Sequence, residues 1–247
     1  ENYKYAINEL PEMKSAIHDW YKNRYNVELT YDEMICLQGS QEALSTLFLA
    51  MCDPGDIVLV PDPYYPIFSD GPKIAGAKVE YMPLLQENNY VIQLDQIDEE
   101  IAKKAKMMIV SYPNNPTCAI APDSFYEELI QFAKKYDIVV LHDNAYSELV
   151  FDGKVGKSFL SFEGAKEIGI ELNSFSKTYG MAGARLGVCV GNKEVIDCYN
   201  TLKSNMDYGI FLPIQYAGIE ALRHGGASIH STCQAYQDRR DALCEAF

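Results

Sequence analysis

Lys177 and Arg185 are the two residues whose side chains most clearly suit a reactive site. They lie eight positions apart in residues 174–187, which read SFSKTYGMAGARLG. A lysine amine can form a Schiff base with an aldehyde, and an arginine guanidinium can hold a phosphate with its planar fork. The glycines let backbone approach a bound group, which a surface lysine in an ordinary glycine-rich turn does not require. We therefore interpret the run as a site that holds pyridoxal phosphate covalently.

The same run resembles the lysine-attachment motif of the class I/II aminotransferases, the fold type I enzymes that use pyridoxal phosphate. Every fixed position of that motif is matched, and the resemblance extends from about Tyr3 to the C-terminal end. It implies that Lys177 forms a Schiff base with pyridoxal 5′-phosphate. It also implies transfer of an amino group between an L-amino acid and a 2-oxo acid. The segment 203–209 resembles the branch of LL-diaminopimelate, aspartate or alanine aminotransferases.

An anion site is indicated at Ser40 and Gln41, where an expected strand ends and an expected helix begins. The free backbone N–H groups and the positive end of the helix dipole would face whatever lies beyond the strand. On this segment alone, Ser40 as a simple helix cap is the alternative. By resemblance, the residues around the cofactor phosphate are Ser40, Gln41, Ser174 and Arg185.

Asp143 ends an expected buried strand, and a buried carboxylate needs a cationic or hydrogen-bonding partner. A pyridinium nitrogen would be such a partner, and Coulomb attraction would keep it protonated. The alternative is that Asp143 caps the following turn. Tyr146 and Asn115 can place their polar groups near the ring oxygen. The predicted catalytic residues are therefore Lys177, Asp143 and Tyr146.

One of two adjacent tyrosines is expected to stack on the cofactor ring, which contributes about 1 kcal/mol beyond area burial. The position after Pro63 favours Tyr65 over Tyr64, and core packing is the alternative for either. Nearby, Cys118 stands where family members carry the glycine of an Asn-Pro-Thr-Gly run. If that position needs a positive φ, Cys118 is strained or the loop differs.

The hydrophobic pattern predicts an α/β fold. Strands are expected near 34–37, 57–60, 78–82, 107–111, 138–142, 168–172 and 186–190. Helices are expected near 11–26, 41–52, 66–75, 122–136, 192–205 and 213–224. This alternation indicates βαβ crossovers and a mostly parallel sheet with helices on both faces. Only about a dozen residues separate the last two strands, too few for a helical crossover, so the last strand is expected to run antiparallel. By resemblance this is the seven-stranded large domain of fold type I.

Ligands of open α/β sheets bind beyond the carboxyl ends of the strands. Four of the predicted site residues, on different strands or the loops that follow them, fall at such ends: Ser40, Tyr65, Asn115 and Asp143. We therefore expect them to converge on one place.

The charge and the cysteine and histidine content of the chain limit the partners, metals and compartments that we expect. The 247 residues carry a net charge of −14, which disfavours nucleic acid and anionic membranes. Seven scattered cysteines without a C-x-x-C pair are typical of buried, reduced thiols in a cytoplasmic protein. Four histidines without ligand spacing make a metal site improbable. The sequence has no secretion signal and no apolar run long enough to span a membrane.

We expect residues 1–247 to be the pyridoxal-phosphate-binding large domain, and a fragment, because both ends fall within ordered-looking segments. The resemblance implies that a small C-terminal domain, with an arginine for the substrate α-carboxylate, and the N-terminal arm are absent. It also implies a homodimer with shared active sites, in which Tyr3 or Tyr5 and residues 203–209 reach the neighbour.

Two other functions stay open. A lyase or decarboxylase on the same fold would share every cofactor contact named above, because the reaction depends on which Cα bond lies perpendicular to the ring. A non-catalytic effector domain of a transcription regulator is the second alternative, which the acidic charge disfavours.

Overall fold

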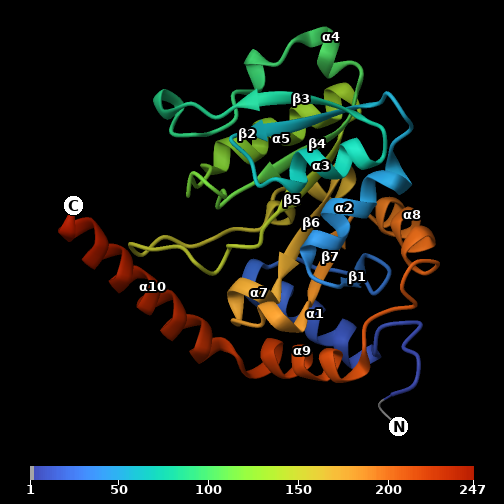
Figure 1. Cartoon of the computed structure of the whole chain (residues 1–247), viewed down its shortest axis with the longest axis vertical. Helices are drawn as coiled ribbons and strands as arrows, with labels where there is room; N and C mark the ends of the chain where they lie inside the picture. The colour runs from blue at the N-terminus through green and yellow to red at the C-terminus, as the bar shows by residue number, and fades with distance from the viewer. Residues whose placement is uncertain (1–2) are drawn as a thin grey trace.

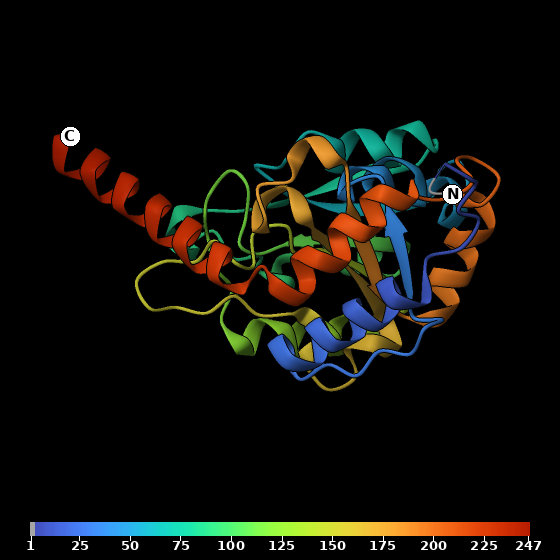
Figure 2. The same ribbon diagram turned by 90° about the horizontal axis from the view of Figure 1, so that it is seen from below.

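One seven-stranded sheet lies between helices on both faces in the computed structural model, which describes residues 3–247 (Figures 1 and 2). The strands are β1 (Met34–Leu37), β2 (Ile57–Asp62), β3 (Lys78–Pro83), β4 (Ala105–Ser111), β5 (Val139–Asp143), β6 (Gly169–Ser174) and β7 (Gly187–Gly191). Their order in the sheet is β1-β7-β6-β5-β4-β2-β3. Strand β7 runs antiparallel to both of its neighbours, and the other pairs are parallel. The predicted α/β class and the antiparallel last strand are both confirmed.

The predicted helices are all present, with ends that differ by one or two residues. They are α1 (Pro11–Tyr25), α2 (Ser40–Met51), α3 (Ile67–Ile74), α5 (Asp123–Tyr136), α8 (Lys193–Lys203) and α9 (Leu212–His224). Three short helices were not expected: α4 (Glu99–Ala102), α6 (Ala165–Ile168) and α7 (Phe175–Thr178). The long helix α10 (Gly226–Ala246) was also missed as a complete element.

Helix α1 covers one face of the sheet. It begins at Pro11, whose fixed φ suits a first turn, and ends at Tyr25, followed by Asn26 with a φ of 56°. Its buried Tyr21 hydroxyl donates to Oε1 of Glu171 in β6 at 3.0 Å. The same carboxylate accepts from the Ser158 hydroxyl and the Phe159 backbone N–H. A single buried carboxylate thus ties α1 and the chain before α6 to the middle of the sheet.

The opposite face is covered by α2, α3 and α8. Its core includes Leu44 and Phe48 of α2, Phe68 of α3, Leu141 of β5 and Tyr199 of α8. Side chains alternate along a strand, so Asp143, two residues after Leu141, points toward this face. The carboxyl edge of the sheet beside α2 is therefore where a functional site can form.

Helix α10 extends away from the body of the molecule (Figure 2), and none of its side chains is buried. It is attached through Asp152, in the loop that follows β5. Both Asp152 carboxylate oxygens accept from Arg240 at 2.7 Å, and the Asp152 N–H donates to Gln237 at 3.1 Å. The thiol of Cys233 lies 3.3 Å from the carbonyl oxygen of Val150. Polar contacts with one loop hold this part of the helix.

All seven cysteines are free thiols. Cys36 and Cys189 are buried as expected, whereas Cys118, Cys198 and Cys244 are exposed, so the prediction of buried thiols is only partly correct. Between residues 3 and 247, no three metal-binding side chains come together in a ligand cluster. Within the same range, no helix has the length and apolarity to cross a bilayer.

Candidate active site

A cavity of about 240 Å³ lies at the carboxyl edge of the sheet. It is lined by all nine residues predicted from the sequence: Ser40, Gln41, Tyr65, Asn115, Asp143, Tyr146, Ser174, Lys177 and Arg185. Asp143 and Ser174 end β5 and β6, and the other seven come from the loops or helices that follow β1, β2, β4, β5, β6 and α7. The expected convergence is therefore present, while the role of each residue remains a prediction.

One end of the cavity suits an anion. Helix α2 begins at Ser40, directly after Gly39, which has a φ of 75°. The guanidinium of Arg185 lies against this turn and donates to the carbonyl oxygen of Ala182 at 3.0 Å. A Cβ at position 39 would lie 2.3 Å from Nη2 of Arg185, so any other residue would be strained at this φ and would displace the guanidinium. The helix start and the guanidinium together offer positive potential and N–H donors.

The other end of the cavity carries a buried acid. Asp143 is buried, and its Oδ1 has no hydrogen-bond partner in the described chain. Burial raises the pKa of the Asp143 carboxyl to about 6, and the charge of Glu171 adds to the rise, while His142 and the Ala145 N–H oppose it. A carboxylate in this position is stabilised by a cationic N–H group brought into the cavity.

Lys177 lines the same cavity and lies on the short helix α7, which follows β6. The Ser174 hydroxyl accepts from the Ser176 N–H at 3.2 Å and caps this helix. Nζ of Lys177 lies 5.8 Å from the centre of the Tyr146 ring. Burial, followed by the charge of Asp143, raises the pKa of Tyr146 above its usual value, so its hydroxyl stays protonated as a donor. An amine and a phenol thus face the same space.

The structure separates the two candidate tyrosines. Tyr65 lines the cavity, and its hydroxyl donates to Oε1 of Gln41 at 3.0 Å. Tyr64 stacks instead on Tyr81, with ring centres 5.5 Å apart and an angle of 14° between the planes. Tyr65 is therefore the residue that can present an aromatic face to a ligand.

Cys118 adopts the conformation that the comparison with glycine suggested. Its φ is 60°, in the left-handed region, and its N–H donates to the Asn114 carbonyl at 2.8 Å. The exposed side chain lines a second cavity of about 410 Å³, which shares Asn115 and Tyr146 with the first. The strain expected from the sequence is present, and it lies beside the site.

Four further residues line the first cavity but were not identified from the sequence: Leu44, Ala145, Ser176 and Ala182. The Ser176 hydroxyl lies 3.5 Å from Nη1 of Arg185 and belongs to the run that was singled out, so its position could have been used. The other three are apolar side chains without a chemical signature.

Comparison with known proteins identifies the family. Residues 2–247 match the family Aminotransferase class I and II. The chain belongs to this family. Over 235 residues it is 50% identical to the LL-diaminopimelate aminotransferase of Halothermothrix orenii, covering 95% of the chain and 60% of the relative. It is 44% identical to the enzyme of that name from Moorella thermoacetica, covering 100% and 64%.

Solved structures agree with this assignment. The substrate-bound BacF structure from Bacillus subtilis has a TM-score of 0.96 at 38% identity, covering 99% of the chain and 63% of that protein. An aminotransferase from Staphylococcus aureus has a TM-score of 0.94 at 34% identity, covering 98% and 64%. The likeness to the aminotransferase structure confirms the predicted fold type I. The chain spans 60% to 64% of the length of these two curated relatives.

Pyridoxal 5′-phosphate is the cofactor of this family, as predicted, and the cavity fits it. Asp143 offers an unpartnered carboxylate oxygen for a protonated ring nitrogen. Arg185 and the start of α2 suit the phosphate, and Lys177 supplies the amine for an aldehyde. Each charged part of the cofactor thus has a counterpart in the cavity.

Proposed function

We propose that the protein is an aminotransferase that moves an amino group between an L-amino acid and a 2-oxo acid, with pyridoxal phosphate attached to Lys177. The observation that carries this proposal is the meeting of Lys177, Asp143 and Arg185 in one cavity. The names of the relatives favour amino transfer over a lyase or a regulator, and they make LL-diaminopimelate the first amino donor to test.

The proposed binding roles follow from the chemistry of each side chain. Arg185, the Ser174 and Ser40 hydroxyls and the first N–H groups of α2 hold the phosphate. Tyr65 lies against the ring and is itself held by Gln41. These contacts orient the cofactor and exclude water from its face.

The proposed chemical roles fall to four side chains. When bound, pyridoxal phosphate supplies an aldehyde and a ring that accepts electron density from the substrate Cα. Asp143 keeps the proton on the ring nitrogen, because a cation relieves its buried charge. Tyr146 and Asn115 hydrogen-bond the ring oxygen. Nζ of Lys177 would anchor the cofactor and, once released by the substrate amine, would take the proton from Cα and deliver it to the carbon of the former aldehyde.

Borohydride reduction tests the anchor directly. Reduction of the protein loaded with pyridoxal phosphate should add the mass of the reduced cofactor to the peptide containing Lys177. Lys177→Ala should lose this addition and all turnover, whereas Lys154→Ala, at an exposed position outside the site, should keep both. A modified protein without label on the Lys177 peptide would overturn the proposed attachment.

Product analysis separates the reaction types. LL-diaminopimelate, aspartate and alanine should each be offered with and without 2-oxoglutarate. An aminotransferase should form glutamate only when the 2-oxo acid is present. Release of carbon dioxide or of an eliminated side chain without an oxo acid would instead identify a decarboxylase or lyase.

We also propose that residues 1–247 form the pyridoxal-phosphate-binding large domain and that the protein works as a cytoplasmic homodimer with shared active sites. The free cysteines support a reducing compartment.

Two exposed tyrosines support the dimer, since Tyr3 and Tyr5 are 88% and 82% exposed. The Tyr3 ring lies 5.9 Å from that of Phe211, and the Tyr5 ring lies 5.5 Å from that of Tyr208, and both partners are also exposed. Such a contiguous aromatic surface suits a second copy. Sedimentation of the protein, with Tyr5→Ser as the variant, tests the dimer.

A further inference from the structure

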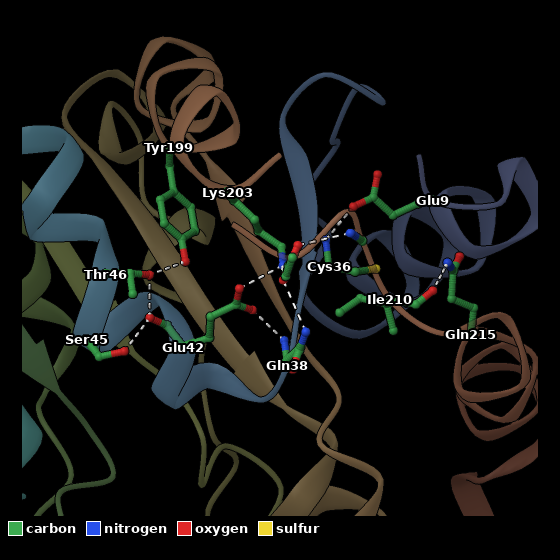
Figure 3. Close-up of polar contacts among 12 residues, drawn as sticks. Glu9, Cys36, Gln38, Glu42, Ser45, Thr46, Tyr199, Lys203, Ile210 and Gln215 are labelled. Carbon is green, nitrogen blue, oxygen red and sulfur yellow. Dashed lines mark hydrogen bonds and ion pairs between the residues drawn. The ribbon is translucent and has the colours of Figure 1, made fainter. Parts of the chain in front are cut away.

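Four residues outside the cofactor cavity form a closed ring of polar contacts, which we call the Lys203 ring. Lys203 at the end of α8 pairs with Glu42 of α2, with Nζ and Oε1 2.8 Å apart, and also with Asp207. The backbone N–H of Gln38 donates to Oε2 of Glu42 at 2.6 Å, and its side-chain amide donates to Asp207 at 3.2 Å. Figure 3 shows Gln38, Glu42 and Lys203 facing one another across the gap between α2 and α8.

The three charged members of the ring are largely removed from water, whereas Gln38 is exposed. The side chain of Lys203 is 4% exposed, and those of Glu42 and Asp207 are 16% and 14% exposed. Burying an ammonium group costs free energy unless the group is paired. An apolar side chain at position 203 would pack equally well without this cost. The two carboxylates compensate this cation, so the three charges depend on one another. Loss of any one of them disturbs the positions of the others.

The Lys203 ring contacts the backbone segment that precedes α2, at the phosphate end of the cavity. Gln38 directly precedes Gly39, against which the Arg185 guanidinium lies. Glu42 is in the first turn of α2, and its bond back to the Gln38 N–H closes the turn from which Ser40 begins the helix. A shift of Glu42 would therefore move the first N–H groups of α2 relative to Arg185.

A second polar contact between the same helices lies one turn further from the cavity. The Tyr199 hydroxyl and Oγ1 of Thr46 are 2.8 Å apart, and Thr46 also donates to the Glu42 carbonyl at 2.7 Å (Figure 3). This contact joins α8 to α2 without touching the turn at Gly39. It offers a natural comparison for the ring.

We propose that Lys203 is a positioning residue for the cofactor phosphate: through Glu42 it holds the start of α2 in the geometry that, with Arg185, binds the anion. This inference rests on the proposed function, because it assumes that the cavity binds pyridoxal phosphate. Lys203 does not line the cavity itself. Its effect reaches the ligand only through Glu42 and the Gln38 backbone.

The test compares pyridoxal phosphate with pyridoxal, which has the same aldehyde and ring but no phosphate. Absorbance titration gives the dissociation constant of each for wild type and Lys203→Met. We expect Lys203→Met to weaken pyridoxal phosphate binding about tenfold and to change pyridoxal binding less than about twofold. A merely structural loss would weaken both ligands alike, and equal effects on both would overturn the proposal.

Glu42→Gln separates positioning from simple electrostatics. Removal of the Lys203 cation makes the region more negative, and removal of the Glu42 anion makes it less negative. Long-range charge effects on a phosphate would therefore have opposite signs in the two variants. Positioning predicts that both variants weaken pyridoxal phosphate binding, because both break the ring. Tighter binding by Glu42→Gln would overturn the proposal, and this variant decides the question if Lys203→Met does not fold.

Two variants on the same helix serve as controls. Tyr199→Phe breaks the second contact between α2 and α8, and Lys193→Met removes an exposed lysine that pairs with Asp197 four residues on. Neither should change the ratio of the two dissociation constants by more than about twofold. If wild type binds neither aldehyde at Lys177, the proposed function fails. If wild type binds both and Lys203→Met leaves the ratio unchanged, only the present inference fails.

Discussion

Gly39 and Arg185 lie in contact at the phosphate end of the cavity, so closely that a Cβ on residue 39 would come within 2.3 Å of Nη2 of the arginine. The two residues are far apart in the sequence, and each occupies a positive φ, 75° and 50°. Their contact brings the start of α2 and the loop after α7 to one anion site.

Gly39→Ala should therefore weaken cofactor binding. The new methyl group would displace the guanidinium, and we expect the dissociation constant for pyridoxal phosphate to rise about tenfold or more. Gly153→Ala is a matched control, because Gly153 has a φ of 69° but, apart from its chain neighbours, no atom of residues 3–247 within 4 Å of its Cβ position. Both variants should lose about 1–2 kcal/mol of stability from backbone strain. Equal cofactor affinities in the two variants would contradict the role of the contact.

Asp143→Asn should stabilise the cofactor-free protein in a pH-dependent way. Burial raises the pKa of the folded carboxyl to about 6 from its ordinary 3.8, so its ionisation destabilises the fold increasingly as pH rises through this interval. The gain from Asn should be about 3 kcal/mol at pH 8 and about half of that at pH 5.

Denaturant titration at the two pH values measures this difference. Asp95→Asn, at an exposed position, should change the free energy of unfolding by less than about 0.5 kcal/mol at either pH. With pyridoxal phosphate bound, the order should reverse, because only the carboxylate stabilises a protonated ring nitrogen. A pH-independent gain from Asp143→Asn would rule out the buried charge as its cause.

Tyr65→Ala should weaken cofactor binding about tenfold, since it removes the aromatic face in the cavity. Tyr65→Phe should retain most of the affinity, because the ring remains and only the bond to Gln41 is lost. Tyr64→Ala is the neighbouring control and should affect stability alone, through its stack on Tyr81. Fluorescence titration with pyridoxal phosphate measures all three. A larger loss in Tyr64→Ala than in Tyr65→Ala would reverse the assignment.

Cys118→Gly should make the protein more stable than Cys118→Ala. Glycine is ordinarily the less stable of the two by roughly 0.5–1 kcal/mol, but a φ of 60° penalises any Cβ by about 1–2 kcal/mol. The glycine variant should therefore be ahead by several tenths of a kcal/mol or more in thermal or denaturant unfolding. The ordinary order, with alanine ahead, would mean that the loop relaxes to another conformation.

Many of the site residues could be predicted from the sequence because their motifs lie within short segments. The run around Lys177 and the acid that ends β5 each lie within a short segment, and parallel strands bring their carboxyl ends to one edge. Lys203 is different: Asp207 is only four residues away in the sequence, just beyond the end of α8, but Glu42 comes from another helix. Contacts between distant segments leave no periodic pattern in a single sequence.

Glu171 illustrates the same limit in the core. Its strand reads as an apolar element, and nothing adjacent indicates that a carboxylate there would be fully buried. Its donors come from Tyr21, Ser158 and Phe159, on segments that meet it only after the chain folds. The position after Pro63 favoured Tyr65, but the local sequence left core packing open for either tyrosine, and the stack of Tyr64 on Tyr81 appears only in the fold.

The attachment of α10 has a mechanical consequence. None of the side chains of α10 is buried, and the ion pair between Arg240 and Asp152 attaches this helix to the loop after β5. Asp152 is six residues beyond Tyr146 on that loop. A displacement of the C-terminal end of α10 would be transmitted through the Arg240–Asp152 ion pair to loop residues 146–152, which include Tyr146. The contacts of α10 with Val150 and Asp152 therefore connect this helix to the loop that carries Tyr146 in the cavity wall.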